Sequence, residues 1–172
     1  YCDTNFAIGV GSGSDALSFS MIALNIGKGD EVIIPSNSFI ATAWTVVNVG
    51  ATPVFVDVLE DFNINPKKIE MAITRNTKAI IPVHLTGRIA DMEQINLIAK
   101  KYNLYVIEDA AQAVGASLNN KKSGSFGITG CFSLHPLKNL HVQGDGGIIT
   151  TNDERLYMKL LRLQQNGTNM CY

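Results

Sequence analysis

Short apolar runs alternate along the chain with longer segments in which apolar residues recur at helical spacing. This alternation is typical of an α/β protein whose mostly parallel sheet is flanked by helices. The predicted strands are 32–34, 54–56, 79–83, 104–107, 116–118, 128–132 and 147–150. The predicted helices are 14–26, 39–49, 66–73, 92–101 and 153–165. Pro66 suits the first position of its helix, because that position needs no N–H partner.

The composition fits one domain and favours no macromolecular partner. The 172 residues are 46% hydrophobic, enough for one sizeable core, so we expect a single domain over 1–172. The 14 basic and 15 acidic residues are scattered, which predicts neither a nucleic-acid nor a membrane-surface partner. No apolar run approaches the roughly 20 residues of a membrane helix, and no signal peptide is evident. The opening at Tyr1, without a methionine, predicts an internal piece of a longer protein.

The cysteines and histidines predict neither a disulfide framework nor a metal site. Three cysteines cannot all pair with one another, and they lack metal-ligand spacing, so we expect a reducing, cytoplasmic environment. The three histidines are too dispersed for a metal site or a catalytic dyad. These residues are Cys2, Cys131, Cys171, His84, His135 and His141.

A glycine- and serine-rich segment, 9–17, leads into the first predicted helix. Small residues let the backbone approach an anion, and a helix start offers unpaired N–H groups. Gly11, Gly13 and Ala16 also satisfy the loose dinucleotide pattern G-x-G-x-x-A. However, Pro35-Ser36 stand where a dinucleotide fold has an acidic residue. A turn and helix cap without a ligand is the alternative interpretation.

A carboxylate closes the apolar run Val106-Ile107-Glu108-Asp109. An acid at the carboxyl end of a buried strand points into the crevice where open α/β sheets bind ligands. The plainer interpretation of Asp109 is a helix cap or a solvated loop acid. Gln112, three residues on, could reach the same cavity and donate to a ring oxygen.

Lys138 follows the apolar strand that ends in Ser133 and precedes the glycine-rich turn 144–147. Loop lysines are usually solvated, but such a strand and such a turn favour a place near a site. A lysine in a dry pocket loses its proton more easily and becomes nucleophilic. Lys138, Ser133 and Asp109 together provide an imine-forming amine, a phosphate contact and a partner for a pyridine nitrogen. These are the groups that hold pyridoxal 5′-phosphate (PLP).

Taken together, the motifs closely resemble the DegT/StrS-type sugar aminotransferases, PLP enzymes of the aspartate aminotransferase fold (fold type I). The resemblance covers essentially the whole chain. It implies the PLP-binding large domain of a protein about twice as long, with the C-terminal small domain absent from this chain. The segments that carry it are 11–17, 29–33, 50–54, 83–87, 108–113 and 132–140.

The resemblance implies a role for each chemical group around the ring. Lys138 would bind PLP as a Schiff base and then move a proton between the substrate carbon and the cofactor. Asp109 would pair with the pyridine nitrogen, and Gln112 would lie near the ring hydroxyl. Related dehydratases carry histidine in place of the lysine, so Lys138 favours transamination.

The resemblance also implies how the rest of the cofactor is held. The phosphate would bind Gly13, Ser14, Asp15 and Ser133, and a neighbouring subunit of a homodimer would add a further contact. Phe39 would stack on the cofactor, although helical periodicity alone favours core positions for Phe39 and for Trp44.

The implied reaction transfers an amino group from an amino acid, for which we expect glutamate, to a nucleotide-linked keto sugar in amino-sugar and polysaccharide biosynthesis. Asn139-Leu140 and 144–147 resemble the branch that aminates C3 of a 6-deoxy sugar, whereas the C4 branch more often carries Glu in place of Asp145. Three alternatives stay open: a C4-directed or other PLP enzyme of this fold, a non-catalytic protein that kept the fold, and a nucleotide-cofactor oxidoreductase.

Overall fold

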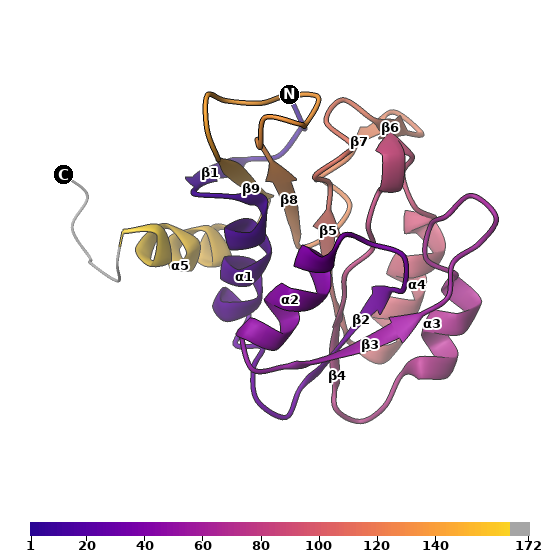
Figure 1. The fold of residues 1–172 in the computed structure, drawn as a ribbon. Coiled ribbons are helices and arrows are strands. Elements are labelled where there is room, and N and C mark those ends of the chain that lie inside the picture. The colour runs from indigo at the N-terminus through magenta and orange to yellow at the C-terminus, as the bar shows by residue number, and fades with distance from the viewer. Residues whose placement is uncertain (166–172) are drawn as a thin grey trace.

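The computed structural model describes residues 1–165, which form a seven-stranded sheet with helices on both faces (Figure 1). A separate two-stranded hairpin consists of β6 (Ser117–Leu118) and β7 (Lys121–Lys122). From one edge of the large sheet to the other the strands are β1 (Phe6–Val10), β9 (Gly147–Thr151), β8 (Thr129–Ser133), β5 (Tyr105–Asp109), β4 (Thr77–Ile80), β2 (Glu31–Pro35) and β3 (Thr52–Val56).

The large sheet is mostly parallel, as the alternation of strands and helices predicts. Strands β8, β5, β4, β2 and β3 pair in parallel, and β9 runs antiparallel to both β8 and β1. The carboxyl ends of the parallel strands therefore meet along one edge of the sheet. In open α/β sheets this edge is where ligands bind.

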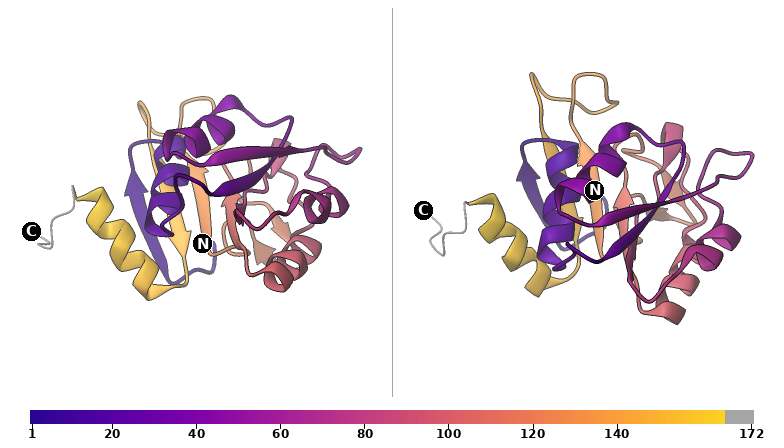
Figure 2. Two further views of the ribbon diagram at one scale, coloured as in Figure 1. Left: turned by 90° about the horizontal axis from the view of Figure 1, so that it is seen from below. Right: turned by 60° about the horizontal axis from the view of Figure 1, so that its bottom comes forward.

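Helices cover both faces of the sheet and enclose two cores (Figures 1 and 2). Alternate residues of one strand enter opposite cores: Val32 and Ile34 of β2 lie in the first, and Ile33 lies in the second. This alternation follows from the two-residue period of a strand. The first core is covered by α1 (Gly13–Ala23), α2 (Ile40–Asn48) and α5 (Glu154–Gln164), and the second by α3 (Pro66–Ala72) and α4 (Met92–Tyr102).

Side-chain caps fix the starts of four helices. In each, an oxygen of the N-cap residue accepts a hydrogen bond from a backbone N–H of the first turn, which has no partner inside the helix. Pro66 is the first residue of α3, as predicted. The N-cap residues are Ser12, Asn65, Asp91 and Asp153.

The structure corrects two predicted boundaries and adds an edge strand. The helix predicted over 14–26 ends at Ala23, because Asn25 takes a left-handed conformation with φ of 58°. The strand predicted over 79–83 pairs only to Ile80, followed by an isolated bridge from Val83 to Asp109. Strand β1 was not predicted: it is a five-residue edge strand with only one fully buried residue, Ile8.

Within residues 1–165, no helix is both long and apolar enough to span a membrane. Cys2 and Cys131 are free thiols. Cys171 lies outside the described residues.

Candidate active site

A cavity of about 530 Å³ opens at the carboxyl edge of the parallel strands. Its walls come from the start of α1, the start of α2, the end of β5 and the loop between β8 and β9. All eight residues that the sequence singled out line it, although they are spread over more than 120 positions of the chain. They are Gly13, Ser14, Asp15, Phe39, Asp109, Gln112, Ser133 and Lys138.

Asp109 is a buried carboxylate at the end of β5, and each of its oxygens has a donor. The Thr42 hydroxyl donates to Oδ2 at 2.9 Å, and the Ala111 backbone N–H donates to Oδ1 at 3.2 Å. Burial raises the pKa of Asp109 above its ordinary value, while Thr42, Ala111 and the charge of Lys138 lower it. The carboxylate is thus held in one orientation, in surroundings that would favour a cation beside it.

Thr42 is a site residue that the sequence analysis missed. It lies on the buried face of α2, and its hydroxyl donates its hydrogen bond to Asp109. A buried hydroxyl almost always has a hydrogen-bond partner. The sequence offered one signal for Thr42: it lies in the first turn of a predicted helix that follows the end of a predicted strand.

The start of α1 can accept an anion. Ser12 caps the helix through its Oγ, which accepts from the Asp15 N–H at 3.0 Å. The N–H groups of Gly13 and Ser14 lie in the same first turn, where a helix offers no internal acceptor. A Cβ on Gly13 would lie 2.7 Å from the Cβ of Ser133, so glycine allows this backbone to reach the end of β8.

Gln112 is oriented by a short turn, η1 (Leu85–Gly87), that follows β4. The Thr86 N–H donates to Gln112 Oε1 at 3.0 Å, and Thr86 itself has a left-handed φ of 54°. With the amide oxygen engaged, the NH₂ group is the part of the side chain left to donate. Donation from this NH₂ group to the ring oxygen stays a prediction.

Lys138 lies in the loop between β8 and β9 and contributes to the cavity wall. Its backbone N–H donates to the His135 carbonyl at 2.8 Å, which places it in a tight turn. The Leu134 and Gly146 backbones close the base of the loop at 2.8 Å. The lysine is therefore presented by a closed loop, and its charge is close enough to lower the pKa of Asp109.

Phe39 and Trp44 are not core residues, contrary to the prediction from periodicity. Their exposed fractions are 70% and 54%, and both line the cavity. The buried face of α2 consists instead of Thr42, Thr45 and Val46. The hydroxyls of Thr42 and Thr45 make hydrogen bonds on the inner side of the helix, and this leaves Phe39 and Trp44 on its outer side.

Cys131 lies two residues before Ser133 but is not a candidate nucleophile. Its side chain is buried, with Sγ 3.4 Å from the Ser20 hydroxyl. Burial raises the pKa of the thiol to about 12. Nucleophilic cysteines need a thiolate, so Cys131 acts as a packing residue. Among residues 1–165, no group of three or more His, Cys, Asp or Glu side chains could hold a metal ion.

Known proteins share both the sequence and the fold. The family model described as the DegT/DnrJ/EryC1/StrS aminotransferase family matches residues 1–171. A UDP-N-acetyl-3-dehydro-alpha-D-glucosamine 3-aminotransferase from Acidithiobacillus ferrooxidans is 54% identical over 166 residues, covering 96% of this chain and 45% of that protein. The chain spans about half the length of the curated relatives it matches.

Two solved structures show the same fold. The S. venezuelae protein DesV, solved in complex with a ketimine intermediate, superposes with a TM-score of 0.96 at 44% identity and covers 100% of this chain and 47% of its own. NtdA from Bacillus subtilis, solved with the bound cofactor PMP, gives a TM-score of 0.89 at 40% identity, with 98% of this chain and 39% of its own covered.

Proposed function

Because the chain belongs to the DegT/DnrJ/EryC1/StrS aminotransferase family, we propose that residues 1–172 are the PLP-binding large domain of a transaminase. The enzyme transfers an amino group from an amino acid, glutamate, to a nucleotide-linked keto sugar. The observation that carries the proposal is that the amine of Lys138 and the buried carboxylate of Asp109 line the same cavity as the start of α1.

The residues of the cavity fit PLP. A carboxylate whose pKa is raised by burial is stabilised by a cation, and Asp109 could therefore hold the protonated pyridine nitrogen of PLP. The first turn of α1 and the Ser133 hydroxyl suit the phosphate. Phe39 supplies an aromatic ring at the cavity wall, and the NH₂ group of Gln112 can donate to the ring oxygen.

When bound, PLP supplies an electron sink for the pair of electrons left as a proton departs from the substrate carbon. Asp109 holds a proton at the ring nitrogen, and Thr42 and Ala111 keep its carboxylate from turning. Lys138 provides the amine that attaches the cofactor, and it then takes a proton from one carbon and returns it to another. Phe39 and Trp44 border the cavity in which these proton transfers would take place.

For the substrate, we propose a sugar with its keto group at C3. The Acidithiobacillus ferrooxidans relative, which is 54% identical, is named as a 3-aminotransferase of a 3-dehydro sugar. Asp145 of the glycine-rich turn lines the cavity, where a carboxylate can accept hydrogen bonds from sugar hydroxyls. A keto-sugar panel that shows turnover only at C4 would contradict this assignment.

We also propose that the protein is a cytoplasmic homodimer. Ile40, Trp44 and Val47 form an exposed apolar stripe along α2, at the i, i+4, i+7 spacing of one helix face. A second copy packed on this stripe would also border the cavity, because Trp44 belongs to both. The free thiols of Cys2 and Cys131 support a reducing compartment.

The proposed function is tested by locating the cofactor. Borohydride reduction of the PLP-loaded protein should fix the label on Lys138, as mapped by peptide mass spectrometry. Lys138→Arg should lose the visible absorption band and at least about 10²-fold in turnover, because Arg can neither form the imine nor relay the proton. Lys78→Arg, an exposed change on β4, should leave both unchanged. A label on any other lysine contradicts the assignment.

A further inference from the structure

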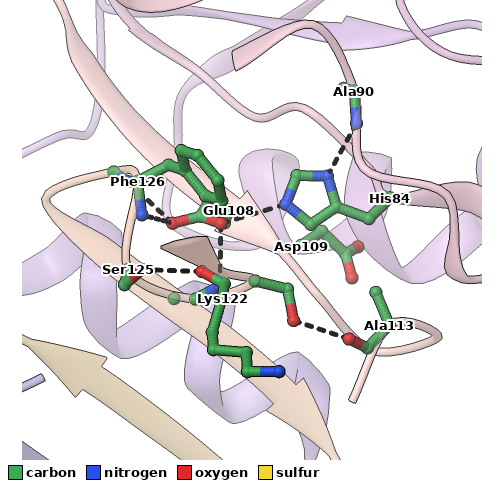
Figure 3. Close-up of polar contacts among 12 residues, drawn as sticks. His84, Ala90, Glu108, Asp109, Ala113, Lys122, Ser125 and Phe126 are labelled. Carbon is green, nitrogen blue, oxygen red and sulfur yellow. Dashed lines mark hydrogen bonds and ion pairs between the residues drawn. The ribbon is translucent and has the colours of Figure 1, made fainter. Parts of the chain in front are cut away.

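A second buried polar group lies directly behind the site without lining the cavity. The side chains of His84 and Glu108 are both 0% exposed, and His84 Nε2 lies 3.0 Å from Glu108 Oε2. Glu108 precedes Asp109 on β5, so its side chain points to the other side of the sheet. Figure 3 shows the histidine ring and the Glu108 carboxylate facing each other beside Asp109.

Glu108 accepts four hydrogen bonds, which fill both of its oxygens. Besides His84, the Gly124 N–H donates to Oε2 at 2.8 Å. The Phe126 and Gly127 N–H groups donate to Oε1 at 2.6 and 2.7 Å. Three backbone donors of one loop, at 124, 126 and 127, thus converge on one carboxylate. Only an acceptor-only group with two oxygens can satisfy all of them at once.

His84 is held equally firmly on its other side. Its Nδ1 accepts from the Ala90 N–H at 3.3 Å, so Nε2 carries the hydrogen that is donated to Glu108. Its backbone N–H donates to the Asp109 carbonyl at 3.0 Å. His84 therefore joins the turn that begins at residue 84 to β5 in two ways, through its backbone to Asp109 and through its side chain to Glu108.

The two segments tied in this way carry residues of the cavity. The turn includes Thr86, whose N–H orients Gln112. The loop at 124–127 packs on β8: a Cβ on Gly130 would lie 2.2 Å from the Cα of Gly124. Because β8 ends in Ser133, displacement of this loop would move the serine that borders the cavity.

We propose that His84 and Glu108 are a positioning pair, which fastens the turn at 84–90 and the loop at 124–127 to the back of β5. The pair thereby fixes Gln112, Ser133 and Asp109 in the orientation that binds PLP. This inference rests on the proposed function of the cavity, since it assigns the two residues to the same site. Neither residue touches the cofactor.

Stability alone does not account for such a pair. A buried ion or hydrogen-bonded pair is usually no more stabilising than apolar residues of the same volume. Here the donors come from two different segments, and each segment continues to a cavity residue. The pair therefore fixes the positions of these cavity residues. Its loss should alter how the cofactor is held even where the protein stays folded.

The test uses three variants of the natural full-length polypeptide loaded with PLP. Glu108→Gln leaves two donors facing an NH₂ group. His84→Asn keeps an acceptor for the Ala90 N–H but removes the donor to Glu108, whereas His84→Gln can still reach Glu108 with its NH₂ group. Thr151→Val is the matched control: it removes a buried hydroxyl that donates to the Ile128 carbonyl, at the other end of the sheet from the cavity.

The readouts are the PLP dissociation constant and the visible circular dichroism of the bound cofactor, at a temperature where each variant is folded. Glu108→Gln and His84→Asn should bind PLP about tenfold more weakly or worse, with an altered dichroism band. In Glu108→Gln two buried N–H donors lose their acceptor, and in His84→Asn the buried Glu108 carboxylate loses the donor that ties it to the turn at 84–90. His84→Gln should lie closer to the wild type. Thr151→Val should lower the melting temperature without changing either readout.

Wild-type affinity and dichroism in both Glu108→Gln and His84→Asn would overturn the inference and leave the proposed function standing. If Glu108→Gln does not fold, the comparison of His84→Asn with His84→Gln decides: equal affinities overturn the inference, and weaker binding by His84→Asn supports it. A wild-type protein that binds no PLP would overturn both the proposed function and this inference.

Discussion

The carboxylate of Asp109 lies inside the protein with one donor on each oxygen, from Thr42 and from Ala111. Two neutral donors do not offset the loss of water around a charge, so the pKa of Asp109 stays raised. The same burial that would suit this residue to the proposed cationic ring lowers the stability of the folded protein when no cation lies beside it. Under the proposed function, binding and stability therefore conflict at this one side chain.

Asp109→Asn should separate the effect of the Asp109 charge on stability from its effect on turnover. In the folded protein the pKa of Asp109 is raised, so folding favours its protonated form, and the wild type loses stability as pH rises from the ordinary value of 3.8 to the raised one. In the cofactor-free protein, Asp109→Asn should therefore be more stable than the wild type at neutral pH, with a gap that closes toward pH 3.8 and below. Urea denaturation at a series of pH values measures this gap.

The control for that series is Asp57→Asn, which removes one exposed negative charge directly after β3. With PLP present, Asp109→Asn should still bind the cofactor and lose most turnover. A cofactor-free Asp109→Asn variant that is less stable than the wild type at neutral pH contradicts the burial argument.

Among the secondary-structure elements, the contact of the α1 start with β8 and β9 decides whether the cavity can form. Gly147 begins β9, pairs with Val10 of β1 and with Ser133 of β8, and lies against the Ser12 carbonyl. A Cβ at Gly147 would lie 2.2 Å from that oxygen, which belongs to the backbone and cannot rotate away. Glycine is required at position 147 because the Ser12 backbone lies so close to it, and not because of a turn conformation.

Gly147→Ala should destabilise the protein by about 1–3 kcal/mol, because the added methyl pushes the capping loop away from the sheet. It should also weaken PLP binding, since that loop carries the N–H groups that we propose as phosphate donors. Gly9→Ala is the matched control on β1, where a Cβ meets nothing within 4 Å; it should be neutral or slightly stabilising. Denaturant midpoints and PLP titrations of both variants measure the two effects, and equal midpoints would contradict the steric argument.

The sequence predicted these elements well where local signals were strong. Pro66 and the apolar run before Asp109 marked an element start and an element end that the structure reproduces. Strand β1 was missed because its few alternating residues carry almost no periodic signal. The outward face of α2 was misassigned because periodicity finds a stripe, whereas tertiary partners such as the Thr42–Asp109 bond decide which side is buried.

At the scale of the whole molecule, the eight candidate residues come together only through the sheet topology. Their motifs suggested one cavity, but the partner of His84 was not foreseeable, because its pairing with Glu108 depends on which strands are neighbours. The apolar stripe of α2 is likewise a property of the assembled surface. Its exposure at the mouth of the cavity is the basis for the proposed dimer.

Ile40→Glu should shift the full-length protein from dimer to monomer, because a charge within an apolar interface is costly to bury. Turnover should fall with it, since the stripe shares Trp44 with the cavity. Met71→Glu, on the exposed face of α3, should change neither property. Light scattering gives the molar mass, and a variant that stays dimeric and fully active places the interface elsewhere.

The pairing of β1 with β9 also governs when the cavity can first exist. Within the described residues β1 pairs with β9 alone, and the hydrogen bond from Asn5 to Asn152 joins positions 147 apart. At about 5–20 residues per second, a ribosome needs roughly 7–30 s to make the intervening chain. Throughout that time the glycine-rich loop has no strand to rest on. The cavity therefore cannot bind PLP until β9 has been made and has left the ribosome, and a nascent chain stopped before β9 should not bind the cofactor.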